Sequence, residues 1–284
     1  DQDGRPRAWA TVHDRAAGRV LASVTVDPAL EATLADPVAA GLFAWAAAES
    51  AGLAAERGLE ATQVDSGAFD DDQRQQRWLE QAGFVRTRTW YQMSRPVTAA
   101  DGDPLAQPEM HPELVVRRVG SGGDGMPDEA DLVAVHEVLE EAFTDHFNYH
   151  AETFDEFLGR LREDPGHRWD HWWLAQLGDG PDGATRPAGA LVSTVSPGSD
   201  GAPDGSYVAY LGVLRSARGR GAARSLLQAV IVDAAARGRV SVGLEVDADS
   251  PTGAVGLYES TGFARRYVTQ SWHRDEPASM RPAP

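Results

Sequence analysis

The clearest hydrophobic periodicity in the chain follows Gly221. Apolar side chains recur there at i, i+3, i+4, i+7, i+8 and i+11, namely Ala223, Leu226, Leu227, Val230, Ile231 and Ala234. This spacing predicts a helix over 221–237 with one apolar stripe, which we expect to pack on a sheet. Gly238 follows at the position where a left-handed residue commonly ends a helix.

Shorter apolar runs, separated by Gly and Pro, predict strands and helices on both sides of this helix. The expected strands in the C-terminal part are 114–119, 171–177, 187–195, 206–214, 241–247 and 264–272. The expected helices are 129–143, 152–163, 221–237 and 252–261. A shorter series precedes them: a strand ending at 24–26, an Ala-rich helix, a strand over 61–64, a polar helix and a strand over 87–93. Because parallel strands need a crossover, this alternation predicts an α/β (α+β) fold with a partly parallel sheet.

A Pro-rich segment divides the two series. Residues 95–112 contain four prolines and little apolar periodicity, which is typical of a linker. We therefore expect a first domain over 1–95, a linker over 96–112 and a second domain over 113–284. The first domain lacks the early strand and the two early helices of the second.

Composition and charge exclude several classes of protein. The 284 residues are 42% hydrophobic and carry a net charge of −17, which disfavours a nucleic-acid binder or a binder of anionic membranes. The chain has no Cys, so disulfide scaffolds, Cys-ligated metals and thiol nucleophiles are excluded. No uninterrupted apolar run reaches the length of a membrane helix, and the start shows no signal-peptide pattern, so we expect a cytoplasmic protein. The first residue is not Met, so we leave open whether further residues precede it.

One Gly-rich segment opposes the overall charge. Between 205 and 239 there are six Arg against one acid, Asp233. Within it, Gly219 and Gly221 lie between an expected strand and the expected helix, where unpaired amides and the helix dipole favour an anion. The segment predicts a site for a di- or triphosphate, although a plain turn with surface arginines has the same composition.

Two motifs in this region resemble those of the GCN5-related N-acetyltransferases (GNAT). Arg218-x-x-Gly221-x-Ala223 is similar to the family's acyl-CoA pyrophosphate loop. The segment 245–263, which contains Leu257-Tyr258 and ends in Gly262-Phe263, resembles the family's next strand and helix. The resemblance implies tandem GNAT-like domains, each a mixed, mostly antiparallel sheet with a central parallel pair flanked by helices, the first lobe being incomplete.

The resemblance also implies a set of cofactor contacts. Acetyl-CoA would be the co-substrate, with no metal, and its expected contacts are Leu211, Gly212, Val213, Arg218, Gly219, Arg220, Gly221, Ala222, Ala223, Ser250 and Leu257. The loop amides would hold the pyrophosphate, the strand edge would pair with the pantetheine arm, and the Val213 amide would polarise the thioester carbonyl. Ser250 stands where many relatives carry Asn. Tyr258 would protonate the departing thiolate, unless it is only a packing residue.

The general base and the acceptor wall are less defined by the motifs. Glu245 is the candidate base, with Asp247, Asp249 and a water chain as alternatives. The acceptor would contact the segment after the first long helix, through His146, Asn148 and Tyr149. His146 and His150 beside Asp145 also have the spacing of a metal pair, but no third ligand motif follows. Trp169, Trp172 and Trp173 are expected to be core residues.

The first lobe resembles a degenerate copy of the same module. Aligned on the two Gly-Phe pairs, Leu79 replaces Tyr258, while Ala35 and Val38 replace Arg218 and Gly221. Neither an acid nor a phosphate loop is expected there. A tandem arrangement with one degenerate lobe is similar to that of the mycothiol synthases.

These features predict an N-acyltransferase that moves an acetyl group from acetyl-CoA to a primary amine of a small molecule. The attack would be direct, in a ternary complex, within the second lobe. No nucleic acid and no membrane is expected as a partner, and a homodimer is open. The alternatives are a non-catalytic acyl-CoA-binding regulatory module, a mycothiol-synthase-like activity, and a phosphate-loop kinase, which the absence of any Lys disfavours.

Overall fold

The computed structural model describes residues 4–15, 18–103, 112–122, 125–144, 149, 151–163, 167–178, 185–199 and 201–279. These residues form two compact units that interleave along the sequence. The first contains the described residues up to Tyr91, Asp247–Asp249, and the described residues from Tyr267 onward. The second contains Gln92–Val246 and Ser250–Arg266. The division into 1–95, 96–112 and 113–284, which was drawn from sequence likeness, stays a prediction.

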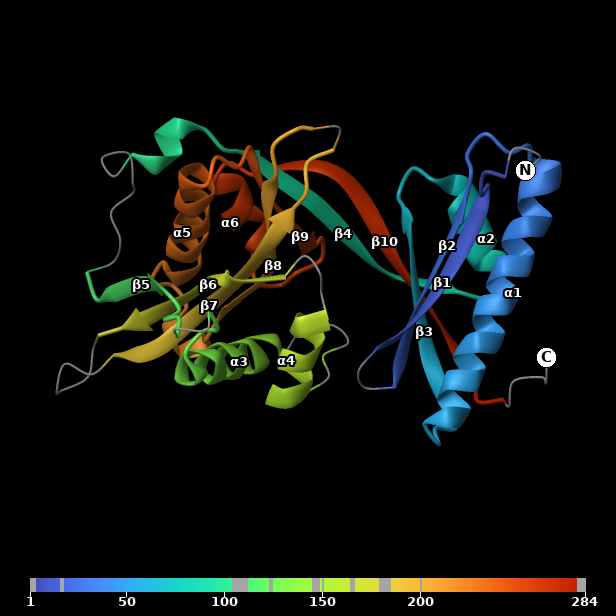
Figure 1. Ribbon diagram of the computed structural model, residues 1–284, viewed down its shortest axis with the longest axis horizontal. Coiled ribbons are helices and arrows are strands. Elements are labelled where there is room, and N and C mark those ends of the chain that lie inside the picture. Colours follow the sequence, from blue (N-terminus) through green and yellow to red (C-terminus); the bar gives the residue numbers. More distant parts are fainter. Residues whose placement is uncertain are drawn as a thin grey trace. The chain divides into compact units, whose positions relative to one another are not determined.

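The described part of the first unit is a mixed sheet with the helices α1 and α2 (Figure 1). Its strand order is β1-β2-β3-β10-β4, and its elements are β1 (Ala8–Arg15), β2 (Arg19–Val26), α1 (Ala32–Glu56), β3 (Ala61–Phe69), α2 (Gln73–Gln81), β4 (Val85–Pro96) and β10 (Ala264–Pro277). β2 and β3 are parallel, whereas β1–β2 and β3–β10 are antiparallel. The last strand of the chain thus completes the first unit, with Thr269 opposite Phe69 and Pro277 opposite Ala61. The sequence did not predict β1 or the first half of β2.

Helix α1 is long and apolar, and its packing explains that composition. It has 25 residues, and an 18-residue stretch of it has a mean hydropathy of 1.4. It is the one described helix that meets the length and composition of a membrane span, which is weak evidence by itself. Its small buried residues Ala35, Ala39 and Ala46 join Phe43 in the core of the first unit. This core also contains side chains of β2, β3 and α2, so one face of α1 packs on the sheet.

The second unit contains the helix and strands expected from the strongest patterns. β4 and β10 each contribute residues to both units. The strand order of the second unit is β10-β4-β9-β8-β7-β6-β5, with β5 (Leu114–Arg118), β6 (His167–Leu177), β7 (Arg186–Ser196), β8 (Gly205–Val213) and β9 (Ser241–Asp247). Its helices are α3 (Glu129–Phe143), α4 (Phe154–Glu163), α5 (Ala222–Ala236), α6 (Ala254–Ser260) and the short turns η1 (Ala99–Gly102) and η3 (Arg215–Ala217). β8 and β9 are the parallel pair. The predicted fold class, a mixed and mostly antiparallel sheet with a parallel pair in each lobe, is confirmed.

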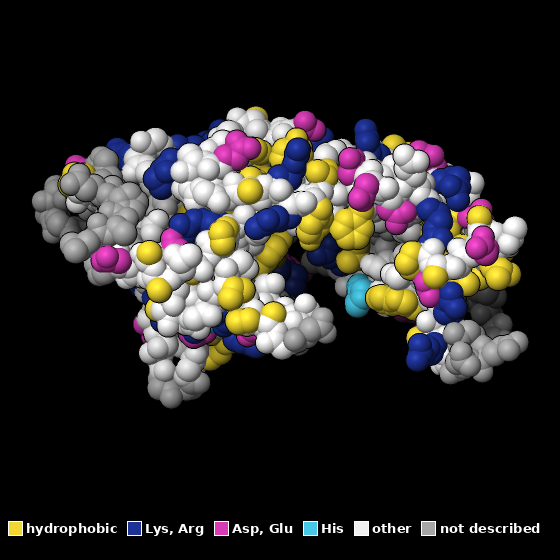
Figure 2. All heavy atoms as spheres, turned by 90° about the horizontal axis from the view of Figure 1, so that it is seen from above, with side chains coloured by type: hydrophobic (Ala, Val, Ile, Leu, Met, Phe, Trp, Pro, Cys, Tyr) yellow, Lys and Arg dark blue, Asp and Glu magenta, His cyan; other side chains and the backbone are white. Residues whose placement is uncertain are grey.

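Helices cover both faces of the second unit's sheet, with α3 and α4 on one face and α5 on the other (Figure 1). The first face includes Trp172, Ala190 and Val192, which pack with α3 and α4. On the second face the predicted stripe of α5 is buried from Leu226 to Ala234, and the expected left-handed residue, Gly238, has φ +68°. On the molecular face in Figure 2, Arg and acidic side chains are interspersed.

Candidate active site

The parallel strands β8 and β9 separate part-way along their length. Their ladder runs from Ser206 opposite Val242 to Val208 opposite Leu244 and ends there. A bulge in β8 accompanies the separation, because consecutive residues of β7 pair with Val208 and Tyr210. Beyond the bulge, β8 continues to pair only with β7 among its described ladders.

The separated end of β8 has a backbone edge that faces away from β7. The Leu214 amide donates to the Ala188 carbonyl on the β7 side at 3.0 Å. Backbone groups alternate in direction along a strand, so Leu211 and Val213 direct theirs toward the side of β9. Gly212, between them, packs closely on α3: a Cβ built on it would lie 2.9 Å from the Ala142 Cβ. The edge at Leu211 and Val213 is therefore not paired with β9 in the described ladders, and its contact with a pantetheine arm stays a prediction.

The predicted phosphate loop is a left-handed turn that ends at the N-terminus of α5. Gly219 and Gly221 have φ of +79° and +81°, which L side chains rarely adopt, and no atom lies within 4 Å of a Cβ built on either. The first bond of the helix is from the Ser225 amide to the Gly221 carbonyl, at 3.0 Å. The amides of Ala222 and Ala223 precede that bond, so they meet the conditions for binding an anion.

Arginines surround this loop in different ways. Arg220 lies 3.4 Å from the Glu113 carboxylate, and Arg224 donates to the Ser260 hydroxyl at 2.8 Å. Arg218 is exposed, and within the described ranges its guanidinium has no hydrogen bond or ion pair. It is the arginine most available to an anionic ligand.

Tyr258 lies in the short helix α6 and is 8% exposed. Its ring is tilted against Phe263, with centroids 6.0 Å apart, and burial raises the pKa of its hydroxyl to about 12. Leu257 beside it is half-buried. Ser250, in the connection before α6, shares a 2.8 Å hydrogen bond with the Thr252 hydroxyl, so its side chain has a local partner.

Glu245 shares a sheet face with Tyr207 and Tyr210. A Cβ on Gly243 would lie 3.3 Å from the Tyr207 ring, and Glu245, two residues further on, faces the same way. Val208 and Tyr210 pair with consecutive residues of β7, so they face opposite ways and Tyr210 joins the Tyr207 face. Tyr210 packs against the core formed with α3 and α4.

The Glu245 side chain is exposed, but neighbouring atoms shield part of its carboxyl from water. Desolvation raises the pKa of Glu245 above its usual value, while a hydrogen bond from the Gln92 amide group opposes that shift. The alternative base Asp247 accepts the Asp249 amide at 2.9 Å and lies 3.4 Å from Arg88, so it is engaged in its own turn.

A polar network that the sequence did not predict lies on the same face. Arg160 makes two bonds to the Glu152 carboxylate, at 2.9 and 2.7 Å, and a third to the Tyr210 hydroxyl at 2.6 Å. Tyr149, a predicted acceptor contact, donates to Glu140 at 2.6 Å. The only signal for these partners was the position of Tyr210, directly before the strand edge.

Some predicted residues fall outside the described part of the chain. These are Asp145, His146, Asn148 and His150, so neither the acceptor wall nor the metal pair built on them is placed. Among the residues that the structure does describe, no group of three His, Asp or Glu side chains is arranged to hold a metal ion.

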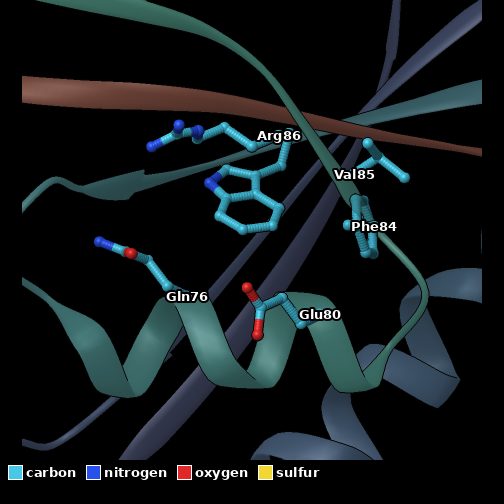
Figure 3. Close-up of a pocket in the computed structure, with 6 residues that line it drawn as sticks. Gln76, Glu80, Phe84, Val85 and Arg86 are labelled. Atoms are coloured by element: carbon cyan, nitrogen blue, oxygen red, sulfur yellow. The ribbon is translucent and has the colours of Figure 1, made fainter.

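A separate hollow occurs in the first unit. Its volume is about 420 Å³, and Gln76, Glu80, Phe84, Val85, Arg86 and Trp272 line it (Figure 3). None of the predicted site residues is among them.

Comparison with known proteins finds a family model that matches part of the chain. Residues 132–263 match the family model described as "Acetyltransferase (GNAT) family". This segment is similar to the GNAT acetyltransferases, and the predicted resemblance to that family is confirmed. The matched range contains the loop, the separated strands and Tyr258. The chain is also similar to solved structures across most of its length.

Two solved structures resemble the whole fold. A GCN5-related N-acetyltransferase from Sphaerobacter thermophilus has a TM-score of 0.71 at 24% identity, covering 97% of this chain and 78% of that one. A tandem GNAT protein from the clavulanic acid biosynthesis pathway has a TM-score of 0.59 at 14% identity, covering 96% and 85%. These likenesses show the tandem fold.

Curated relatives are similar in sequence over a large part of the chain. A mycothiol acetyltransferase from Kocuria rhizophila is 32% identical over 75% of this chain, and one from Thermobispora bispora is 31% identical over 68%. The alignments span 64% and 59% of those proteins, so the chain spans about three fifths of their length.

Proposed function

We propose that the second unit transfers an acetyl group from acetyl-CoA to a primary amine of a small molecule. The observation that carries this proposal is the combination, within the family-matched residues, of separated parallel strands with the loop at 218–223. The loop amides and Arg218 bind the pyrophosphate, and the edge at 211–213 pairs with the pantetheine arm. Arg220, Ser250 and Leu257 border the same cofactor, and no metal takes part.

The proposed reaction is a direct attack in a ternary complex. The amine nitrogen forms a bond to the thioester carbon, the carbon–sulfur bond breaks, and CoA leaves as a thiolate. The Val213 amide donates to the developing oxyanion. Glu245 accepts the proton lost by the amine, and its raised pKa makes it a stronger base than an ordinary carboxylate.

Tyr258 stabilises the leaving group. With a pKa of about 12 it stays protonated near neutral pH and is a weaker acid than a free thiol of about 8.5. It therefore acts first as a hydrogen-bond donor to the developing negative charge on sulfur. A hydroxyl held at this place favours departure of the thiolate.

For the acceptor, the names of the curated relatives favour a compound related to mycothiol. Tyr149, Asn148 and His146 are proposed to contact it, with Tyr149 held by Glu140.

Tyr258→Phe tests the proposed chemistry. We expect turnover with a responsive amine, found by screening glucosamine, cysteine and spermidine among other primary amines, to fall about 100-fold or more. Acetyl-CoA affinity, measured by calorimetry, stays unchanged because the loop and strand edge are intact. Equal turnover in both forms would refute the role of Tyr258. Cofactor binding without turnover on any amine would support the non-catalytic module instead.

A further inference from the structure

The first unit also has a parallel strand pair that separates. The described ladder of β2 and β3 ends at Leu21 opposite Asp65. On β2 the Asp27 amide bonds toward β1, to the Arg7 carbonyl at 2.8 Å. By alternation, Val24 and Val26 direct their backbone groups to the side where β3 separates.

Two side chains from α2 occupy that backbone edge. Gln75 donates from Nε2 to the Val24 carbonyl at 3.3 Å. Arg74 donates from Nη2 to the Val26 and Asp27 carbonyls, both at 3.3 Å. Its other nitrogen, Nη1, donates to the Leu30 carbonyl at 3.2 Å, within the turn that leads into α1. The guanidinium thus bonds to successive carbonyls along the exit of β2.

Other residues of the first unit hold this arginine in place. The Arg74 guanidinium lies 4.8 Å above the Trp78 ring. Trp78 donates from Nε1 to Asp36 at 2.7 Å, and Arg77 lies 3.1 Å from the same carboxylate. Asp36 belongs to α1, which already begins at Ala32. In the sequence alignment, 35–38 correspond to 218–221. The first unit therefore has helix α1 and the Asp36 carboxylate at the positions that form the glycine loop in the second unit.

The second unit lacks both of these side chains. Aligned on Gly83-Phe84 and Gly262-Phe263, Arg74 corresponds to Gly253 and Gln75 to Ala254. Neither a Gly nor an Ala has a side chain that can donate a hydrogen bond to a strand edge. The edge that corresponds to 24–26 is 211–213. At the two aligned positions, α6 and the residue before it offer no such donor to this edge.

We propose that Arg74 and Gln75 close the first unit to acyl-CoA by taking the hydrogen-bonding positions of a pantetheine arm. Gly253 and Ala254 leave the matching positions of the second unit open. The pair thereby determines which lobe binds the cofactor. This inference rests on the proposed function, because it assumes that the edge at 211–213 holds pantetheine.

Transplanting the closing side chain tests the inference. Ala254→Gln places a Gln in the second unit at the position of Gln75, at the start of α6, where Gln is compatible with a helix. We expect the Kd for acetyl-CoA, measured by calorimetry on the full chain, to rise at least about tenfold. Gly256→Gln is the matched control, since Gly256 lies on the same helix with no atom within 4 Å of its Cβ position. It should bind as the unmodified chain does.

The outcomes separate the two proposals. One site per chain, weakened by Ala254→Gln and unaffected by Gly256→Gln, supports the closing role. Two sites per chain, or unchanged affinity in Ala254→Gln, would overturn it while leaving acetyl-CoA binding intact. An unmodified chain that binds no acetyl-CoA would overturn the proposed function itself.

Discussion

Gly212→Ala gives a quantitative test of how α3 sets the position of β8. The new Cβ would lie 2.9 Å from the Ala142 Cβ and 3.1 Å from the Leu139 Cδ2. Carbon atoms in good contact are about 3.5–4.0 Å apart. The Leu139 side chain can rotate, but the Ala142 Cβ is fixed to the backbone, so α3 or β8 must move. We expect a loss of about 1–3 kcal/mol in the free energy of unfolding.

A double-mutant cycle isolates this contact. Ala142→Gly alone should cost about 1 kcal/mol or less, because it places Gly near the end of a helix. In the double variant the clash disappears, so the summed loss should exceed the measured loss by about 1–2 kcal/mol. Chemical denaturation of the four proteins provides the values. Strictly additive losses would refute the claim that close packing of α3 on Gly212 sets the strand edge.

Two further predictions concern titration. The pKa of His171 is lowered by burial, against the opposing effect of its hydrogen bond to the Asp170 carboxylate, so the unfolded state takes up its proton first as the pH falls. The free energy of unfolding should therefore decline as the pH falls below about 6.5, the ordinary pKa of His. Chemical denaturation of His171→Gln across this pH range should show a shallower decline. The same pH dependence in both proteins would contradict this prediction. For Glu245, whose pKa is raised, the acid limb of kcat should lie above the usual range of a Glu carboxyl, and Glu245→Gln should remove that limb and lower kcat about 100-fold or more. An unchanged pH profile in Glu245→Gln would assign the base elsewhere, with Asp249 as the next candidate.

The sequence predicted elements best where one face is strongly apolar. The stripe of α5, the helix α3 over 129–143 and the strand β9 over 241–247 all have the predicted bounds or lie within a residue of them at each end. These elements have a regular period and end at Gly or polar residues, so local pattern and tertiary packing agree. The loop glycines were recognisable because positive φ is a property of the backbone that favours Gly.

Other features depended on contacts between distant residues. The strand β10 extends to Pro277 because it pairs with β3, two hundred or more residues earlier, and no local pattern indicates that partner. Arg160 and Glu152 have ordinary surface composition, yet they join Tyr210 through side-chain bonds between a helix, a connection and a strand. The same holds for Arg74, whose role depends on carbonyls that only the fold brings to it.

The most direct test of the central claim is a calorimetric titration of acetyl-CoA into the unmodified chain, Gly221→Glu and Gly238→Glu. Both glycines have positive φ, lie at opposite ends of α5 and have no atom within 4 Å of a built Cβ, so the two variants carry similar backbone strain and the same charge. The account predicts one site per chain, unaffected in Gly238→Glu and lost in Gly221→Glu, where a carboxylate meets the proposed pyrophosphate position. Equal binding in all three proteins, or no binding to the unmodified chain, would contradict an acetyl-CoA site at the loop of the second unit.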